Sequence, residues 1–113
     1  MRRGHRFYLE DILTSINKIE NYIYDSNFED FVKNEMKLDA VVRNLEIIGE
    51  ASRNIPVEIK EKYPNVEWRK IGDFRNILAH EYFGVDHEIL WDIITNKLKT
   101  LRSEIQSIIT EEK

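Results

Sequence analysis

The sequence predicts an all-α protein, a single domain over residues 1–113 that folds as an up-and-down bundle of four to five main helices and one or two short ones. Apolar residues recur at three- and four-residue intervals along most of the chain, which is the period of a helix buried on one side. Glycine and proline are scarce, at four and two residues, so the chain is rarely interrupted. The sequence contains no Asn-Gly or Asp-Gly turn and no long alternation of apolar and polar residues, which are the patterns that would indicate a sheet.

The first helix is expected over residues 6–24. Its apolar positions fall at helical spacing with charged residues between them, at Phe7, Ile12, Leu13, Ile16, Ile19 and Ile23. The polar residues 25–27 end this helix. Ser26 precedes Glu29 by three positions, the spacing of a capping box, so a short helix is expected to start there and continue through Val32.

A second long helix is expected from about Glu35 to Asn54, because the apolar period returns at Leu38, Val41, Val42, Leu45, Ile48 and Ala51. Pro56 cannot continue an existing helix, but it is suited to the start of a new one. A short helix is therefore expected over residues 57–63, where Pro64 stops it, and a further helix over residues 68–80.

The last helix is expected to be long, with a stripe of apolar residues along one side. Gly84 interrupts the preceding segment and Asp86 is a suitable N-cap. The stripe that follows is wider than a two-per-heptad seam, which favours a bundle helix over a lone coiled coil. Its members are Ile89, Leu90, Ile93, Ile94, Leu98, Leu101, Ile105, Ile108 and Ile109.

Composition excludes several classes of protein. There is no cysteine, so neither a disulfide framework nor a thiolate metal site is possible. No apolar stretch is long enough to span a bilayer, and the first residues lack the apolar region of a signal peptide. A net charge of −4 argues against a general nucleic-acid coat protein. A cytoplasmic protein without a membrane partner is expected.

The candidate functional residues share one face of the helix over residues 68–80. At 100° per residue, Ile71, Phe74 and Leu78 fall together as the core face. Arg75 and His80 mark the two edges of the opposite face, about 140° apart. The residues Gly72, Asn76 and Ala79 lie between them. A glycine within a helix costs about 1 kcal/mol relative to alanine, so Gly72 suggests that something approaches this face closely.

These residue types suit cleavage of RNA without a metal. An imidazole at His80 can take the proton of a 2′-hydroxyl, and the Arg75 guanidinium can bind the extra negative charge of the pentavalent phosphorus. Asn76 can hold His80 in one tautomer or bind a phosphate oxygen. One histidine does not easily serve as base and acid together, which favours a two-fold dimer with a shared cleft. The alternative is that these are ordinary surface residues of a solvated helix.

Two blocks of the sequence carry a resemblance to a known family. Residues 71–86 read IGDFRNILAHEYFGVD, and residues 40–51 read AVVRNLEIIGEA. Together with Tyr63, Pro64 and Trp68 and the closing helix, they resemble the HepT-like branch of the HEPN superfamily over nearly the whole chain. The Arg-x4-His core alone is a weak pattern, but the asparagine after the arginine, the tyrosine two after the histidine and the upstream block make it specific.

The resemblance implies a homodimeric HEPN bundle that acts as a metal-independent endoribonuclease, the toxin of a toxin–antitoxin pair. It implies a minimal nucleotidyltransferase as antitoxin partner, which neutralises the toxin by transferring AMP to the motif tyrosine. By position, Arg75 and His80 are then catalytic, Asn76 supports them and Tyr82 is the modified residue. No metal or cofactor is implied. If the helix continued to Tyr82, an AMP there would lie beside Arg75 and compete with substrate phosphate.

Other polar groups have structural explanations. The polar residues of the upstream block, Arg43, Asn44, Glu46 and Glu50, have the spacing of a solvated or dimer-lining face. Gly49 permits close helix packing, and a dimer contact there is one interpretation. His87 beside Asp86 and Glu88 is better explained by a capped helix start than by a metal cluster.

Two other functions remain open at this stage. The same groove can belong to a non-enzymatic module that binds a nucleotide or the nucleotidyltransferase partner. It can also be only the interface of a dimeric scaffold.

Overall fold

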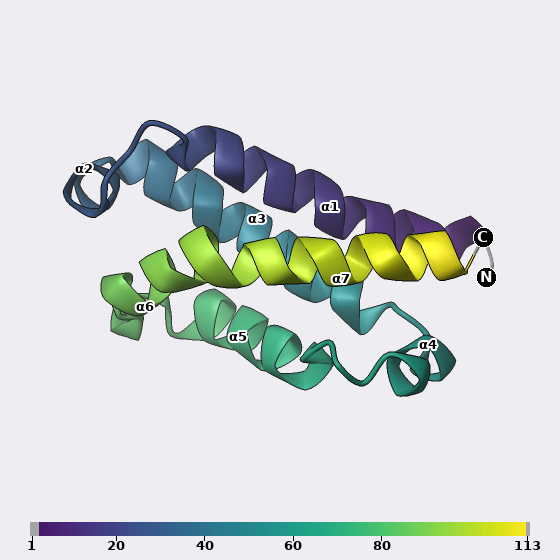
Figure 1. The fold of residues 1–113 in the computed structure, drawn as a ribbon. Coiled ribbons are helices and arrows are strands. Elements are labelled where there is room, and N and C mark those ends of the chain that lie inside the picture. The colour runs from purple at the N-terminus through teal and green to yellow at the C-terminus, as the bar shows by residue number, and fades with distance from the viewer. Residues whose placement is uncertain (1–2, 113) are drawn as a thin grey trace.

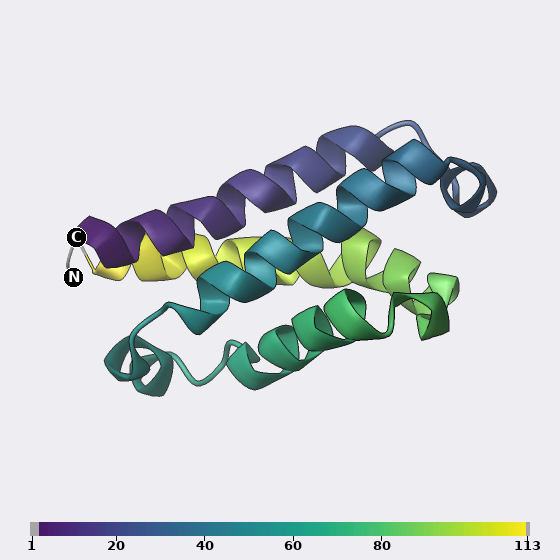
Figure 2. The ribbon, with the colours of Figure 1, turned by 180° about the vertical axis from the view of Figure 1, so that it is seen from behind.

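The computed structural model describes residues 3–112, which form an up-and-down helical bundle (Figure 1). α3 lies between α1 on one side and α5 on the other (Figure 2), and α7 packs against α1. No strand occurs among the described residues, so the predicted fold class is confirmed. The four main helices run alternately in opposite directions and are α1 (Arg3–Ile23), α3 (Glu35–Arg53), α5 (Trp68–His80) and α7 (Leu98–Glu111).

Short helices lie at the two ends of the bundle. α2 (Phe28–Lys33) and α6 (His87–Asp92) lie at one end, and α4 (Val57–Lys62) lies at the other (Figure 1). A single 3₁₀ turn, η1 (Tyr82–Gly84), connects α5 to α6. The predicted bounds of α5 are confirmed, and those of α3 are confirmed to within one residue.

The predicted capping box at Ser26 is wrong. The N-cap of α2 is Asn27, whose side-chain oxygen accepts a hydrogen bond of 2.8 Å from the Asp30 N–H. Ser26 instead accepts a 2.6 Å hydrogen bond from the Lys37 ammonium, which ties the turn to α3. Asparagine is as good an N-cap as serine, so spacing alone could not decide between the two neighbours.

The last predicted helix is continuous in direction but interrupted by a π-helical turn, η2 (Ile93–Lys97). The Thr95 hydroxyl donates to the Trp91 carbonyl at 2.7 Å, a side-chain bond that competes with the regular backbone ladder. The wider turn changes the register between α6 and α7. The predicted N-cap Asp86 is confirmed, with its carboxylate accepting from the N–H of Glu88 at 2.7 Å.

One core runs between the four main helices. Two residues of the predicted apolar stripes do not belong to it: Phe7 is 50% exposed and Ile89 is 57% exposed. In α1 the core stripe instead includes Leu9. No helix in the described part of the chain is long and apolar enough to cross a membrane. The large side chains that are completely buried are Leu9, Ile12, Ile16, Ile19, Phe31, Leu90 and Ile105.

Candidate functional site

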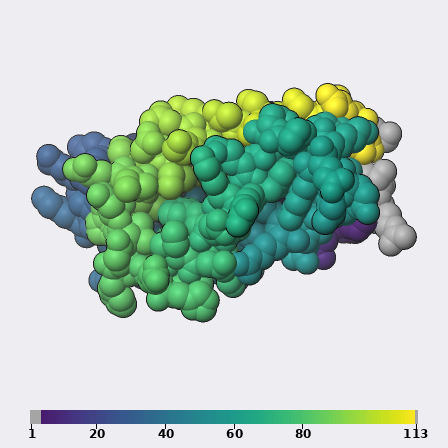
Figure 3. Space-filling model, turned by 90° about the horizontal axis from the view of Figure 1, so that it is seen from below, coloured from purple at the N-terminus to yellow at the C-terminus, as the bar shows by residue number. Residues whose placement is uncertain are grey.

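The predicted face of α5 is exposed on the molecular surface, where α4 and α5 together form one side of the molecule (Figure 3). Leu78 is 2% exposed, while Ile71 and Phe74 are partly buried against the same core. Asn76 and His80 are exposed on the other side of the helix. The helical arrangement expected from the sequence is therefore present, with the core face and the polar face of α5 on opposite sides.

Arg75 is held against α3 by an unusually close approach of the two helices. A Cβ atom placed on Gly49 would overlap the Cβ of Arg75 and lie 2.7 Å from its Cγ. Only glycine therefore fits at position 49 without a shift of α5. The predicted close packing at Gly49 is confirmed, but the group that fills the space is Arg75 of the same chain rather than a dimer partner.

The guanidinium of Arg75 is oriented by the carboxylate of Glu50. Its Nη2 donates to Glu50 Oε1 at 3.3 Å, and its Nη1 lies 3.5 Å from Asn76 Oδ1. The Nε atom is buried and has no hydrogen-bond partner among the described residues. Glu50 also lies 3.7 Å from the guanidinium of Arg43, so one negative charge is shared between two arginines. Arg43 also lies 3.7 Å from a carboxylate oxygen of Glu46, so the two arginines and the two carboxylates carry no net charge between them.

Asn76 contacts arginines rather than the histidine. Its Oδ1 accepts a hydrogen bond from Nη2 of Arg53, the last residue of α3. No hydrogen bond joins Asn76 to His80 in the described part of the chain. In this structure Asn76 therefore links α5 to α3, and the predicted contact that would fix the tautomer of His80 is absent.

His80 is the last residue of α5. The helix ends there because the backbone of Glu81 leaves the helical conformation, although its N–H still donates to the Ile77 carbonyl at 2.7 Å. Within residues 3–112 the imidazole forms no hydrogen bond or ion pair, and it is exposed to solvent. Both ring nitrogens are therefore accessible to a substrate. Arg75 and His80 do not contact each other, as expected.

Tyr82 does not lie where a continued helix would place it. It begins the 3₁₀ turn after α5, and its ring packs against that of Phe83 with centroids 5.7 Å apart. Burial raises the pKa of the Tyr82 phenol, and the negative charges of Asp39 and Glu35 raise it further. The helix stops at His80, so the condition for a position of Tyr82 beside Arg75 is not met. The two carboxylates that act on the Tyr82 phenol belong to the first half of α3.

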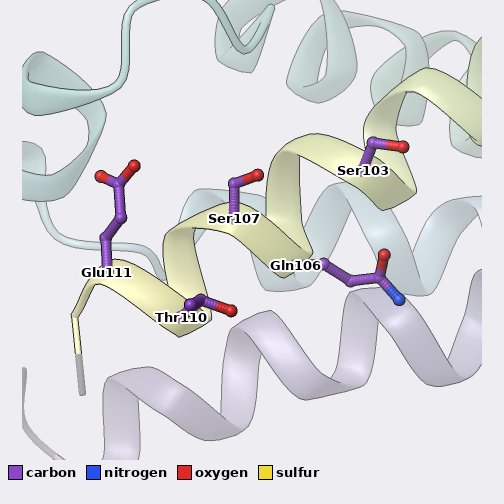
Figure 4. Close-up of a pocket in the computed structure, with 5 residues that line it drawn as sticks. All are labelled: Ser103, Gln106, Ser107, Thr110 and Glu111. Atoms are coloured by element: carbon purple, nitrogen blue, oxygen red, sulfur yellow. The ribbon is translucent and has the colours of Figure 1, made fainter.

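Two hollows occur elsewhere on the surface. One lies on α7 alone and is lined by hydroxyl and amide groups without a cation (Figure 4), namely Ser103, Gln106, Ser107 and Thr110 with Glu111. The other lies where α4 meets the start of α5, beside Trp68, Arg69 and Lys60. No cluster of three or more His, Asp or Glu side chains arranged to hold a metal occurs among the described residues.

The chain is similar to a family of known proteins. Residues 12–108 match the family described as "Ribonuclease HepT-like". The chain belongs to the HepT-like ribonuclease family. The resemblance in residues 40–51 and 71–86 is thereby confirmed, and in this HepT-like chain the matched region contains all four of the predicted site residues.

Three relatives illustrate the similarity of this HepT-like chain to proteins of archaea. It is 41% identical to the "Probable ribonuclease HepT" of Thermococcus cleftensis, over 96% of this chain and 98% of that protein. It is 40% identical to a "Putative RNase" of Methanocaldococcus jannaschii, over 95% of this chain and 98% of that protein.

The third relative is a longer protein of Methanocaldococcus jannaschii, named "Gamma-glutamylcyclotransferase and putative RNase". It is 40% identical over 98% of this HepT-like chain, which spans only 50% of that relative's length. No solved structure is significantly similar to the chain.

Sequence reasoning missed two contributors to the HepT-like site. Glu50 was assigned to a solvated or dimer-lining face, but it pairs with Arg75. Asn44, which was assigned to the same face, is not solvated either: it is buried, and its amide donates to the Ala40 carbonyl at 2.9 Å. Arg53 was not singled out at all. It lies four positions after Gly49, one helical turn away on the same side of α3, and this spacing could have revealed it.

Proposed function

We propose that this protein is the toxin of a toxin–antitoxin pair and an endoribonuclease. It uses the 2′-hydroxyl of the RNA itself as the nucleophile and needs no metal ion. The observation that supports the proposal is the presence on α5 of Arg75, held against α3, and of His80, which is exposed to solvent. Arg75 is fixed there by Gly49 and Glu50, while His80 is left free of protein partners. A fixed cation can stabilise the charged transition state of this reaction, and an accessible imidazole can take the proton of the 2′-hydroxyl.

In the proposed reaction His80 takes the proton of the 2′-hydroxyl. The 2′-oxygen attacks the adjacent phosphorus, and the bond from phosphorus to the 5′-oxygen of the next nucleotide breaks. The products are a 2′,3′-cyclic phosphate and a 5′-hydroxyl, which receives a proton from a general acid. Arg75 binds the non-bridging oxygens, whose negative charge increases in the transition state.

The general acid is proposed to be His80 of a second copy of the chain. Base and acid act on opposite sides of the phosphorus, so one imidazole cannot serve both at once. A two-fold dimer brings two α5 faces to one cleft and supplies the second histidine. Ile77, which is 41% exposed on α5, offers an apolar contact for such an interface.

Regulation is proposed to act through Tyr82. A minimal nucleotidyltransferase transfers AMP from a nucleoside triphosphate to the phenol oxygen, so a new O–P bond forms, pyrophosphate leaves and the phenol proton is lost. Tyr82 is only two residues beyond His80. An added phosphate and base at this position block the end of α5.

The direct test is cleavage of single-stranded RNA in the presence of EDTA by wild type and by His80→Ala. Wild type is expected to cut and His80→Ala to lose at least about a hundredfold in rate. His87→Ala changes a histidine of α6, outside the proposed site, so it is the matched control and should cut normally. Equal cutting by wild type and His80→Ala contradicts the catalytic assignment.

The modification has its own test. The protein is incubated with a cognate nucleotidyltransferase and ATP, and its intact mass is measured. Wild type and Tyr24→Phe, which alters a tyrosine that is 89% exposed, are expected to gain the mass of one or more AMP groups. Tyr82→Phe is expected to gain none. A gain of AMP by Tyr82→Phe contradicts the assignment of this tyrosine.

A second candidate function is a non-catalytic module that binds a nucleotide or the nucleotidyltransferase partner through the same face. The net charge of −4 favours it, because an acidic protein attracts RNA weakly. This function predicts ligand binding that survives His80→Ala, together with no RNA cleavage by the wild type.

A further inference from the structure

We propose that Arg53 is a second phosphate-binding residue of the same face and holds the RNA phosphate next to the one that is cut. This inference rests on the proposed function, because it adds a subsite to the site formed by Arg75 and His80. It is carried by the position of the Arg53 guanidinium over α5 and by the absence of a neutralising carboxylate.

The Arg53 side chain crosses from the end of α3 onto α5. Its Nη2 donates to Asn76 Oδ1, and its Nε lies 4.0 Å from the place that a Cβ on Gly72 would take. Apart from the chain neighbours of Gly72 and the backbone of α5 itself, no other atom of the described residues comes within 4 Å of that place. The guanidinium therefore lies over the surface between Gly72 and Asn76, and the glycine leaves room for it.

The charge of Arg53 is not neutralised within the described part of the chain. Arg75 and Arg43 both lie within 4 Å of the Glu50 carboxylate, but no carboxylate lies within that distance of Arg53. Its side-chain partner is a neutral amide oxygen, which takes up only one of the five N–H groups of a guanidinium. The remaining donors can bind a phosphate through two parallel hydrogen bonds.

The spacing along α5 fits a neighbouring phosphate. Asn76 precedes His80 by four residues, which is about 6 Å along the helix axis. Arg69, Gly72, Asn76 and His80 recur at three- and four-residue intervals, so they form one stripe along α5. Arg69, Asn76 and His80 are exposed on it, and Gly72 is half-buried. An RNA strand that runs along this stripe reaches Arg53 about one helical turn before it reaches His80. Arg53 thus positions the strand, and His80 and Arg75 act at the scissile bond.

The test measures binding of a short single-stranded RNA whose 2′-hydroxyls are all methylated, so that it cannot be cut, at several salt concentrations. Wild type is compared with Arg53→Gln, which removes the charge but keeps a donor for Asn76, and with Arg53→Lys, which keeps the charge. Lys18→Gln, which removes an exposed cation of α1, is the control for net charge. Cleavage of unmodified RNA by the same proteins is measured in parallel.

Arg53→Gln is expected to raise the Kd about tenfold and to reduce the slope of log K against log salt by about 0.7, the value for one phosphate contact on a single strand. Arg53→Lys should retain most of the affinity and the slope, and Lys18→Gln should behave as wild type. Support for the inference requires this difference between the glutamine and lysine variants.

Unchanged affinity and slope in Arg53→Gln overturn the inference. Equal losses in both variants with an unchanged slope also overturn it, because Arg53 then acts only by holding Asn76. Absence of binding of the methylated RNA by wild type also overturns the inference. If the strand binds in an Arg53-dependent way but wild type does not cut unmodified RNA, the proposed ribonuclease function fails while the phosphate site stands.

Discussion

Gly49 and Arg75 show how a functional side chain can be fixed by the residue opposite it. Arg75 could be predicted from the sequence as a site residue, because its spacing to His80 and its flanking residues carry the family pattern. Its environment could not be predicted. The contact with Gly49 joins residues that are 26 positions apart, and no local pattern specifies which residue of α5 meets a glycine of α3.

Gly49→Ala is expected to destabilise the protein by about 1–3 kcal/mol, because the added methyl overlaps the Cβ of Arg75 and the core must shift. Gly72→Ala is the matched control, since only the flexible Arg53 side chain lies near its Cβ position. It should stabilise α5 by up to about 1 kcal/mol through helix propensity. Urea unfolding of both variants measures this. Equal effects of the two substitutions would contradict the packing described.

Tyr82 makes stability depend on alkaline pH. Its pKa in the folded protein is raised, first by burial and then by the charges of Asp39 and Glu35. In the unfolded chain the phenol ionises near its ordinary value of about 10, so the free energy of unfolding falls as pH rises above that value. Tyr82→Phe should lose less stability than wild type between about pH 8 and about pH 10.5, whereas Tyr24→Phe should match wild type. Identical losses in wild type and Tyr82→Phe would refute the shift.

At the scale of helices, the period of apolar residues predicted the bundle better than it predicted the ends of the elements. α3 follows the expected bounds because asparagine caps both of its ends and Pro56 follows it, and α5 begins shortly after Pro64. The capping residue of α2 and the π-helical turn before α7 were not predicted. Both depend on which of several competing side-chain and backbone hydrogen bonds forms, and neighbouring residues offered nearly equal alternatives.

α5 packs on the core through one fully buried side chain and several partly buried ones. Leu78 is the only residue of this helix that is fully buried, at 2% exposure. Leu78→Ala is expected to cost about 2–5 kcal/mol through lost burial and a cavity. Ile77→Ala changes a neighbour that is 41% exposed and should cost much less in the monomer. Thermal unfolding at low protein concentration compares the two, and a larger cost for Ile77→Ala would show that α5 packs differently.

At the scale of the whole molecule, the single chain supplies only one copy of each group that the proposed reaction uses. All-α class, topology and family could be predicted from the sequence, since each depends on patterns repeated along the chain. The arrangement of Glu50 and Arg53 around α5 could not, because it depends on how α3 and α5 pack. We propose that the second histidine that the reaction needs comes from another copy of the chain.

Mixing wild type with inactive chains tests this shared site. With about a ninefold excess of His80→Ala chains, only about one in ten wild-type chains pairs with another wild-type chain. Activity per wild-type chain is then expected to fall about tenfold after the subunits have exchanged. His87→Ala chains added in the same excess should cause no fall. Unchanged activity per wild-type chain with the His80→Ala excess would place a complete site within one chain.

The central claim is that the exposed face of α5 cuts RNA with the RNA's own 2′-hydroxyl. The most direct measurement is an analysis of the product ends after digestion in EDTA of two matched oligonucleotides, one of which carries a single 2′-deoxy residue at the cleaved position. The account predicts a 2′,3′-cyclic phosphate and a 5′-hydroxyl from the first and no cut at the modified position in the second. Products that end in a 3′-hydroxyl and a 5′-phosphate, or cleavage at the 2′-deoxy residue, would contradict it.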